Sequence, residues 1–185
     1  MSLVRLVRHG HAAAGFGDDH DPGLDDLGRS QAAAMAATLG PVGPLPVVVS
    51  PLRRTRETAA PLEAAWGAAA TVDERVAEIP TPTDDLEARA AWLSRAMAST
   101  WTELGADHLA WRDALVAAVL ALPTDTVVVT HFVAINAIVG CAVGDDRVMH
   151  AAIDNCSITT VDTSPLSGKG LAVTELGRTA VTEVR

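Results

Sequence analysis

Short apolar runs alternate along the chain with longer segments whose apolar residues recur at helical spacing. The runs at 3–7, 47–49 and 126–130 consist mainly of valine and leucine, which is typical of buried strands. Residues 71–76 are predicted to form a further strand. Alternating apolar and polar positions predict late strands at 157–161, 171–176 and 179–184, with a turn at 164–170 after the first of them.

Helical periodicity covers most of the sequence between these strands. Residues 25–39 and 52–66 are predicted as helices, and another helix is predicted to begin at His131 and run to about residue 143. The region 84–123 is apolar at helical spacing and is predicted as two helices separated near Gly105.

Strands that alternate with helices predict an α/β fold, because a parallel return between strands needs a crossover helix. We therefore expect a three-layer α/β/α arrangement around a mainly parallel central sheet. A chain of 185 residues is long enough to form one ordinary domain, so residues 1–185 are predicted as a single domain. In such sheets ligands bind beyond the carboxyl ends of the strands.

Composition narrows the classes of partner. Hydrophobic residues make up 49% of the chain and the formal net charge is −9, so a packed core is expected and a basic surface for nucleic acid or anionic membranes is not. The N-terminal residues lack the apolar segment of a signal peptide, and the longest apolar run, 114–122, is too short to span a bilayer. We expect a cytoplasmic protein. Cys141 and Cys156 indicate neither a disulfide framework nor a zinc site.

Arginine and histidine follow each of the three best-defined strands. Arg8 and His9 come directly after the first strand, arginines occupy the first turn of the helix at 52–66, and His131 follows the valines of 126–130. Each segment has an ordinary structural explanation: a surface turn, a solvated basic face paired with glutamates, or a core histidine. Together they would converge on one crevice, where a buried cluster of positive charge needs an anion such as phosphate to compensate it.

At this point the sequence resembles the histidine phosphatase superfamily, also called phosphoglycerate mutase-like. The resemblance covers nearly the whole chain, and its blocks are specific in combination although each is short. They are Leu6-Val7-Arg8-His9-Gly10, Ser50-Pro51-Leu52-x-Arg54-x-x-x-Thr58-Ala59, Arg75-Val76-Ala77-Glu78-Ile79 and Val128-Val129-Thr130-His131, with weaker agreement at 24–32 and 155–159.

The resemblance implies a phosphatase that works through a phosphohistidine intermediate. His9 would be the nucleophile, and Arg8, Arg54 and His131 would hold the phosphoryl oxygens, with neither metal nor cofactor. The general acid and base would be Glu78. The residues alone do not choose among Asp73, Glu74 and Glu78, so this assignment rests on the resemblance. The expected partner is a small phosphorylated molecule, neither nucleic acid nor membrane.

The sequence also departs from the family pattern in places that concern the substrate. His11 stands where the family usually has an acid or amide, the asparagine expected shortly afterwards is missing, and Phe132 replaces a common glycine after His131. The segment 81–108, which corresponds to the part covering the active site in relatives, is short, so we expect a relatively open pocket. Its residues Trp92 and Trp101 are interpreted as core residues, with a place in the pocket wall as the alternative.

Three alternatives to a phosphomonoesterase remain open. A protein phosphohistidine phosphatase would share the fold, and a non-catalytic binding protein would keep the arginines but has no need of His9 and Glu78. A metal-dependent hydrolase would use His9 and His11 with ligands from 18–21, although barrel hydrolases of that kind need longer chains.

Overall fold

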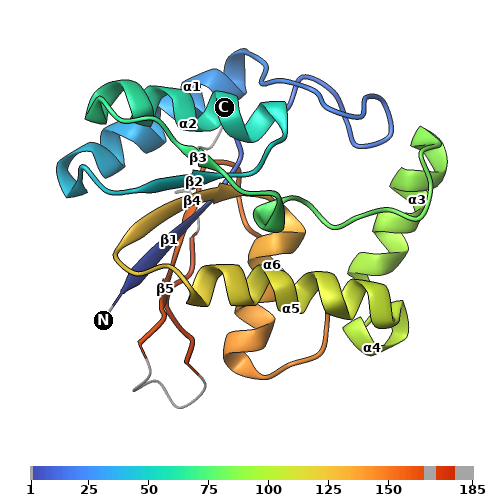
Figure 1. The fold of residues 1–185 in the computed structure, drawn as a ribbon. Helices are drawn as coiled ribbons and strands as arrows, with labels where there is room; N and C mark the ends of the chain where they lie inside the picture. Colours follow the sequence, from blue (N-terminus) through green and yellow to red (C-terminus); the bar gives the residue numbers. More distant parts are fainter. Residues whose placement is uncertain (1, 165–169, 178–185) are drawn as a thin grey trace.

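In a computed structural model of the chain, which describes residues 2–164 and 170–177, one mixed sheet is covered by helices on both faces (Figure 1). The strand order is β3-β2-β4-β1-β5-β6. β1, β2, β3 and β4 run parallel to one another, whereas β5 is antiparallel to β1 and β6 is antiparallel to β5. The strands are β1 (Leu3–Arg8), β2 (Val47–Val49), β3 (Thr71–Val72), β4 (Thr126–Thr130), β5 (Ile158–Asp162) and β6 (Ala172–Glu175).

The three predicted layers are confirmed by the packing. In Figure 1, α1 and α2 lie on one face of the sheet, and α5 and α6 lie on the other. Successive strand residues serve opposite faces: Val127 and Val129 pack in the core under α1 and α2, while Val128 packs in the core under α5 and α6. The helices are α1 (Asp26–Leu39), α2 (Arg53–Trp66), α3 (Leu86–Met97), α4 (Trp101–Leu104), α5 (Ala106–Leu120) and α6 (Phe132–Val143).

Two element predictions are wrong in detail. The strand predicted at 71–76 ends after Val72, because Asp73 accepts a hydrogen bond from the Arg75 backbone at 2.9 Å and starts a 3-10 turn, Glu74–Val76. The region 84–123 holds three helices instead of two. The break at Gly105 is confirmed, with a φ of +90°, but a second break comes before Thr100, which caps α4 through a reciprocal contact with Glu103.

The late strands agree with the prediction as far as the structure describes them. β5 and β6 correspond to the predictions at 157–161 and 171–176, whereas the strand predicted at 179–184 and most of the turn at 164–170 lie outside the described residues. Within the described part of the chain, no helix combines the length and the apolar character needed to cross a membrane.

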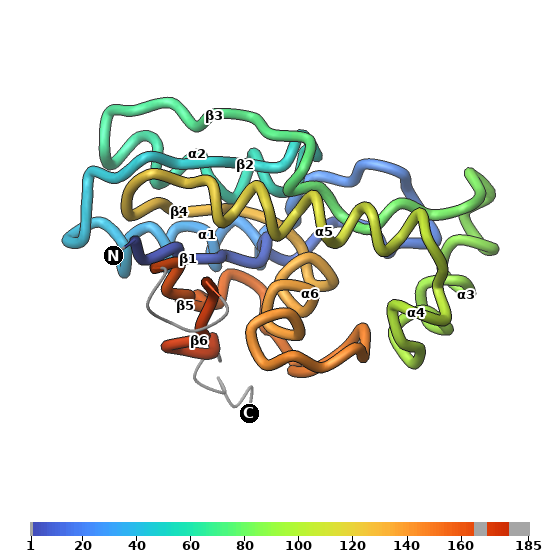
Figure 2. Tube along the Cα trace, turned by 60° about the horizontal axis from the view of Figure 1, so that its bottom comes forward, coloured from blue at the N-terminus to red at the C-terminus, as the bar shows by residue number. Residues whose placement is uncertain are grey.

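The loop after β1 and helix α3 lie at the same end of the molecule. Figure 1 and the rotated trace in Figure 2 both show the loop extending beside α3, beyond the sheet. The contact is made by Arg89 of α3, whose guanidinium lies 4.7 Å from the centre of the Phe16 ring and forms a hydrogen bond with His20. This end of the sheet is the one at which β1, β2 and β4 finish.

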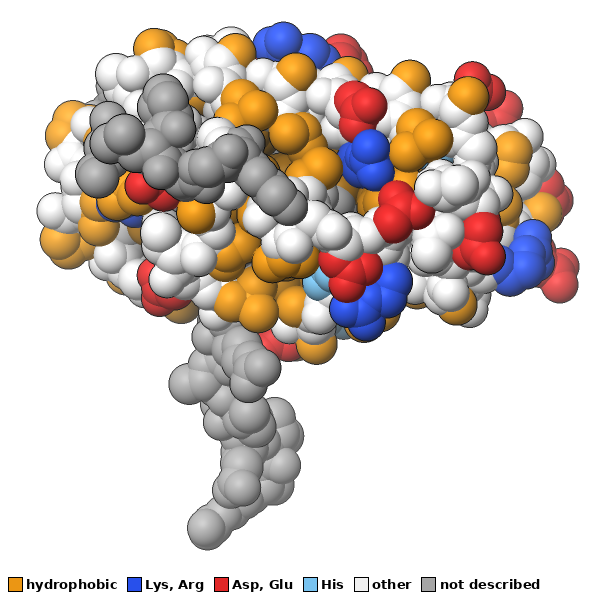
Figure 3. Space-filling model, turned by 90° about the horizontal axis from the view of Figure 1, so that it is seen from below, with side chains coloured by type: hydrophobic (Ala, Val, Ile, Leu, Met, Phe, Trp, Pro, Cys, Tyr) orange, Lys and Arg blue, Asp and Glu red, His pale blue; other side chains and the backbone are white. Residues whose placement is uncertain are grey.

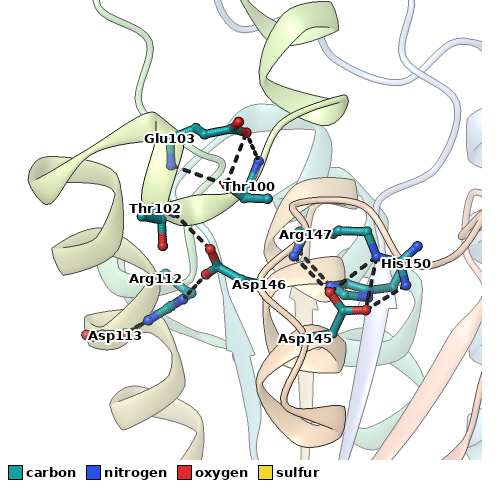
Figure 4. A network of polar contacts seen from close by, with 9 residues as sticks. All are labelled: Thr100, Thr102, Glu103, Arg112, Asp113, Asp145, Asp146, Arg147 and His150. Atoms are coloured by element: carbon teal, nitrogen blue, oxygen red, sulfur yellow. Dashed lines mark hydrogen bonds and ion pairs between the residues drawn. The ribbon is translucent and has the colours of Figure 1, made fainter.

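Charges of opposite sign lie next to one another on the surface. In the view of Figure 3, basic side chains sit beside acidic ones, so the net negative charge does not gather into a single patch on that face. One such group joins three helices (Figure 4). Asp146 accepts hydrogen bonds from the Thr102 backbone at 3.1 Å and from Arg112 at 3.5 Å, which ties the segment after α6 to α4 and α5.

Candidate active site

A cavity of about 630 Å³ opens at the carboxyl end of β1, between the loop that follows this strand and helix α3. Four of the five predicted site residues line it: Arg8, His9, Arg54 and Glu78. They come from the end of β1, the first turn of α2 and the segment after the 3-10 turn at 74–76. The fifth, His131, lies behind them.

His9 is held as a neutral imidazole with one ring nitrogen on the cavity side. Its Nδ1 donates to the Gly10 carbonyl at 2.8 Å, and its Nε2 accepts from Arg54 Nε at 3.3 Å, because a guanidinium can only donate. Burial, followed by the positive charge of Arg54, lowers the pKa of His9 to about 3. The Nε2 lone pair is therefore available without prior loss of a proton.

The backbone around His9 is fixed by contacts from three parts of the fold. The His9 backbone N–H donates to the Thr130 carbonyl of β4 at 2.9 Å, and its carbonyl accepts from the Asn155 side chain at 2.8 Å. Gly10 N–H donates to Thr58 of α2 at 2.9 Å. Sequence reasoning gave Thr58 and Asn155 no role; the only signal was their position inside motif blocks.

Arg54 and Arg8 bring two positive charges close to His9. Arg54 is 6% exposed and Arg8 is partly buried. Glu78 is the carboxyl whose charge acts on both guanidinium groups, with Asp154 acting on Arg8 and Asp21 on Arg54 as well. Arg8 donates to the Ile153 carbonyl at 2.6 Å and lies 5.1 Å from the centre of the Phe132 ring, while its buried Nε has no hydrogen-bond partner among the described residues. Burial lowers the pKa of both arginines, which is the electrostatic environment of an anion site.

His131 occupies the N-cap position of α6 without a side-chain capping bond, and it is fully buried. Its Nδ1 lies 3.3 Å from Arg54 Nη2 and accepts from it, so the ring proton is on Nε2, which lies 2.8 Å from the Ser50 hydroxyl. The ring meets His9 edge-on with a centroid separation of 5.2 Å. Burial and then Arg54 lower the pKa of His131 well below its usual value. Ser50, which fixes this orientation, was another contact that the sequence did not indicate.

Glu78 is the only one of the three candidate acids that reaches the cavity, as far as the structure describes it. Burial raises the pKa of Glu78, and this effect outweighs the hydrogen bond from the Ile79 backbone and the nearby charges of Arg54 and Arg8, which lower it. Asp73 instead pairs with Arg75 at 2.6 Å, which lowers the pKa of Asp73, and Glu74 is exposed. A carboxyl with a raised pKa beside a neutral histidine is suited to giving a proton to a leaving group.

The outer part of the cavity is formed by residues 11–22, by Phe132 and by helix α3. From α3 come Leu93 and Met97, not the tryptophans. Trp101 is 1% exposed and packs against Trp111, which confirms its interpretation as a core residue. Trp92 is partly buried, stacks on His108 and packs against the core without lining the cavity.

Close backbone approach brings α1 against the same loop. A Cβ atom on Gly28 would lie 2.1 Å from the His11 carbonyl oxygen, so only glycine fits there. His9 and His11 both line the cavity, but their Nδ1 atoms are occupied by the Gly10 carbonyl and by Asp25. Among the described residues no group of three or more His, Cys, Asp or Glu is arranged to hold a metal ion, so the metal-dependent alternative has no donor set there.

The family model of the histidine phosphatase superfamily (branch 1) matches residues 4–174. No curated protein matches the chain.

Solved structures resemble the fold over nearly its whole length. A mycobacterial glucosyl-3-phosphoglycerate phosphatase, in complex with VO3, is 24% identical with a TM-score of 0.70, covering 95% of this chain and 97% of its own. A phosphoserine phosphatase from Entamoeba histolytica, in complex with 3-phosphoglyceric acid, is 19% identical with a TM-score of 0.73, covering 97% and 98%. YhfR of Bacillus stearothermophilus is 19% identical with a TM-score of 0.78, also covering 97% and 98%.

Proposed function

The chain belongs to branch 1 of the histidine phosphatase superfamily, and from this membership we propose that it is a metal-independent phosphatase that hydrolyses a phosphomonoester through a phosphohistidine on His9. The observation that carries the proposal is the state of His9. It is neutral, its Nδ1 proton is fixed on the Gly10 carbonyl, and its Nε2 accepts a hydrogen bond from the buried guanidinium of Arg54.

In the first step the His9 Nε2 lone pair attacks phosphorus, and the bond from phosphorus to the ester oxygen breaks. Arg8 and Arg54 neutralise the charge on the phosphoryl oxygens. His131, which lies behind Arg54, completes the binding site for these oxygens. An alkoxide is a poor leaving group, so Glu78 gives it the proton that its raised pKa retains. The product alcohol leaves, and Glu78 is left as a carboxylate.

In the second step water attacks the phosphohistidine. Glu78 takes the proton from this water, the nitrogen–phosphorus bond breaks, and inorganic phosphate departs, which returns both residues to their starting states. The arginines remain charged throughout, so the site needs no metal ion to balance the phosphate.

The position of Glu78 favours phosphomonoesters over protein phosphohistidine. An imidazole leaves readily without strong acid assistance, whereas an alkoxide does not. The alternative of a binding protein is not favoured either, because the cavity holds both a neutral nucleophile and a raised-pKa acid. The small phosphorylated partner and the cytoplasmic location remain predictions.

The test is to trap the intermediate. The protein is mixed with 4-nitrophenyl phosphate carrying radiolabelled phosphorus, in the presence of a strong chelator, and quenched in alkali, in which phosphohistidine survives. We expect label on His9, none in His9→Gln, and unchanged labelling in His108→Gln, whose ring lies outside the cavity. Turnover without label, or turnover abolished by the chelator, would contradict the mechanism.

A further inference from the structure

The cavity extends beyond the phosphate-binding end, and the residues that line its outer part are of two kinds. Phe16, Leu93, Met97 and Phe132 supply apolar surface. His11, His20 and the exposed carboxylates Asp18 and Asp19 supply polar groups. The only described arginines that line the cavity, Arg8 and Arg54, belong to the phosphate end. The outer part therefore offers carbon surface, carboxylates and imidazoles, but no described arginine for a second anionic group.

His11 is the most firmly held polar group of this outer part. Its backbone N–H donates to the Gln31 side chain at 2.9 Å, and its carbonyl accepts from the Asp25 backbone at 3.2 Å. Its ring Nδ1 lies 2.7 Å from Asp25 Oδ2. Asp25 is in turn fixed as the N-cap of α1, accepting from the Gly28 backbone at 2.7 Å.

The Asp25 carboxylate also sets the proton position on the His11 ring. The hydrogen bond from the Gly28 backbone, together with those from His11, keeps the pKa of Asp25 below its usual value, so this group is an acceptor at neutral pH. Nδ1 of His11 must then carry the proton, and in the neutral ring Nε2 carries the lone pair. Nε2 has no hydrogen-bond partner among the described residues, and half of the side chain is exposed at the cavity wall.

We propose that His11, positioned by Asp25, recognises the leaving group of the substrate by accepting a hydrogen bond from one of its hydroxyl groups. The substrate is then the phosphomonoester of an uncharged, hydroxylated carbon skeleton whose apolar edge packs against Phe132 and Leu93. This inference rests on the proposed phosphatase function and adds the substrate class. A carboxylate in the same place would face the acceptor nitrogen of a neutral His11 ring and two further carboxylates, with no described arginine of the outer part to bind it.

The experiment uses three phosphate esters with three-carbon leaving groups. Propyl phosphate has no further polar group, glycerol 1-phosphate adds hydroxyls, and 3-phosphoglycerate adds a hydroxyl and a carboxylate. At pH 8 we expect kcat/KM for glycerol 1-phosphate to exceed that for propyl phosphate by about fivefold, the effect of one hydrogen bond, and to exceed that for 3-phosphoglycerate as well. The difference should lie mainly in KM, because the contact is made in the bound ground state too.

Two variants separate recognition from a structural role. His11→Ala should reduce the advantage of glycerol 1-phosphate over propyl phosphate to less than about twofold. Asp25→Asn keeps an N-cap oxygen for Gly28, but its amide N–H donates to Nδ1 and moves the ring proton to Nε2. That nitrogen can then donate to a carboxylate, so 3-phosphoglycerate should gain relative to glycerol 1-phosphate. Asp26→Asn removes the same charge from a fully exposed side chain and should change neither ratio.

The outcomes separate a failure of the role proposed for His11 from a failure of the proposed phosphatase function. Equal kcat/KM for propyl phosphate and glycerol 1-phosphate, or a preference for glycerol 1-phosphate that survives His11→Ala, would overturn the role of His11. In that case hydrolysis of the esters and the label on His9 would still support the phosphatase function. If none of the three esters is hydrolysed and no label appears on His9, the proposed function itself is overturned. Should His11→Ala fail to fold, the Asp25→Asn ratio decides the question.

Discussion

At the scale of single residues, the site is defined by two titratable groups whose pKa values move in opposite directions. Burial lowers the pKa of His9 and raises that of Glu78, because in each case it disfavours the charged form. A neutral imidazole and a carboxyl with a raised pKa then face the same cavity. This pairing of environments supports the roles proposed for His9 as nucleophile and for Glu78 as proton donor.

Glu78→Gln is expected to separate substrates by their need for a proton. The kcat for propyl phosphate should fall about 10²- to 10⁴-fold, because the alkoxide leaves unprotonated. Phosphoramidate, whose nitrogen already carries its protons, should be affected far less. In the unaltered protein the activity on propyl phosphate should decline as pH rises through the raised pKa of Glu78, and this decline should be missing with phosphoramidate. Equal losses on both substrates in steady-state assays would refute the role of Glu78.

Arg54→Ala is expected to weaken transition-state stabilisation by about 2 to 4 kcal/mol, measured as the ratio of kcat/KM values on an aryl phosphate. Its guanidinium is buried beside His9 and His131, where no solvent can replace it. Arg56→Ala is the matched control, because Arg56 lies on the same helix but is exposed and does not line the cavity. Similar losses in both variants would mean that general surface charge, not a specific contact, is responsible.

At the scale of elements, α2 holds the loop after β1 through one side chain. Thr58 is fully buried; its hydroxyl donates to the Arg54 carbonyl at 2.7 Å and accepts from Gly10 N–H at 2.9 Å. Thr58→Val should lower the free energy of unfolding by about 1 to 3 kcal/mol, because it leaves the Gly10 donor buried without a partner. It should also lower kcat, since the Gly10 carbonyl orients His9.

Thr38→Val provides the comparison for this prediction in urea unfolding. Thr38 makes the same local bond to the carbonyl four residues earlier, at 3.0 Å, but it is exposed and has no tertiary partner of this kind among the described residues. The decrease in the free energy of unfolding caused by Thr38→Val should stay within about 0.5 kcal/mol. Equal destabilisation by the two substitutions would contradict a linking role for Thr58.

Elements with strong local signals were predictable from the sequence, and those decided by side-chain contacts were not. The valine runs of β1, β2 and β4 and the periodicity of α1 and α2 correspond to their predictions closely. The segment 71–76 has valines at 72 and 76, but the Asp73 carboxylate caps the Arg75 backbone and turns the chain away. Likewise, the motif blocks indicated Arg8, His9 and Arg54, whereas Ser50 and Asn155 act through partners distant in sequence, which no local pattern reveals.

At the scale of the whole molecule, an acidic protein concentrates positive charge at one end of its sheet. The chain carries a formal net charge of −9, yet Arg8 and Arg54 line the inner end of the cavity beside Glu78, a carboxyl whose neutral form is favoured by burial. Attraction of an anionic substrate is thus a local property of the cavity. The prediction that residues 1–185 form a single domain is untested, although the sheet joins described strands from both ends of the chain.

The same buried histidines should make the whole fold sensitive to acid. The pKa of His9 is about 3 in the folded protein against 6.5 for an ordinary imidazole, so the unfolded chain binds the proton first as pH falls. The stability linked to His9 is therefore fully present above pH 6.5 and declines from there towards pH 3. Between pH 7 and pH 5 the loss amounts to about 2 kcal/mol, and His131, shifted in the same direction, adds to it.

Urea unfolding of His9→Gln measures the His9 part of this acid sensitivity. Its free energy of unfolding should change between pH 7 and pH 5 by about 2 kcal/mol less than that of the unaltered protein, since glutamine has no proton to bind. His108→Gln, whose ring packs on Trp92 outside the cavity, should keep the unaltered pH difference. If His9→Gln loses as much stability on acidification as the unaltered protein, His9 is not held neutral in the folded state, and the availability of its Nε2 for attack would have to depend on a base.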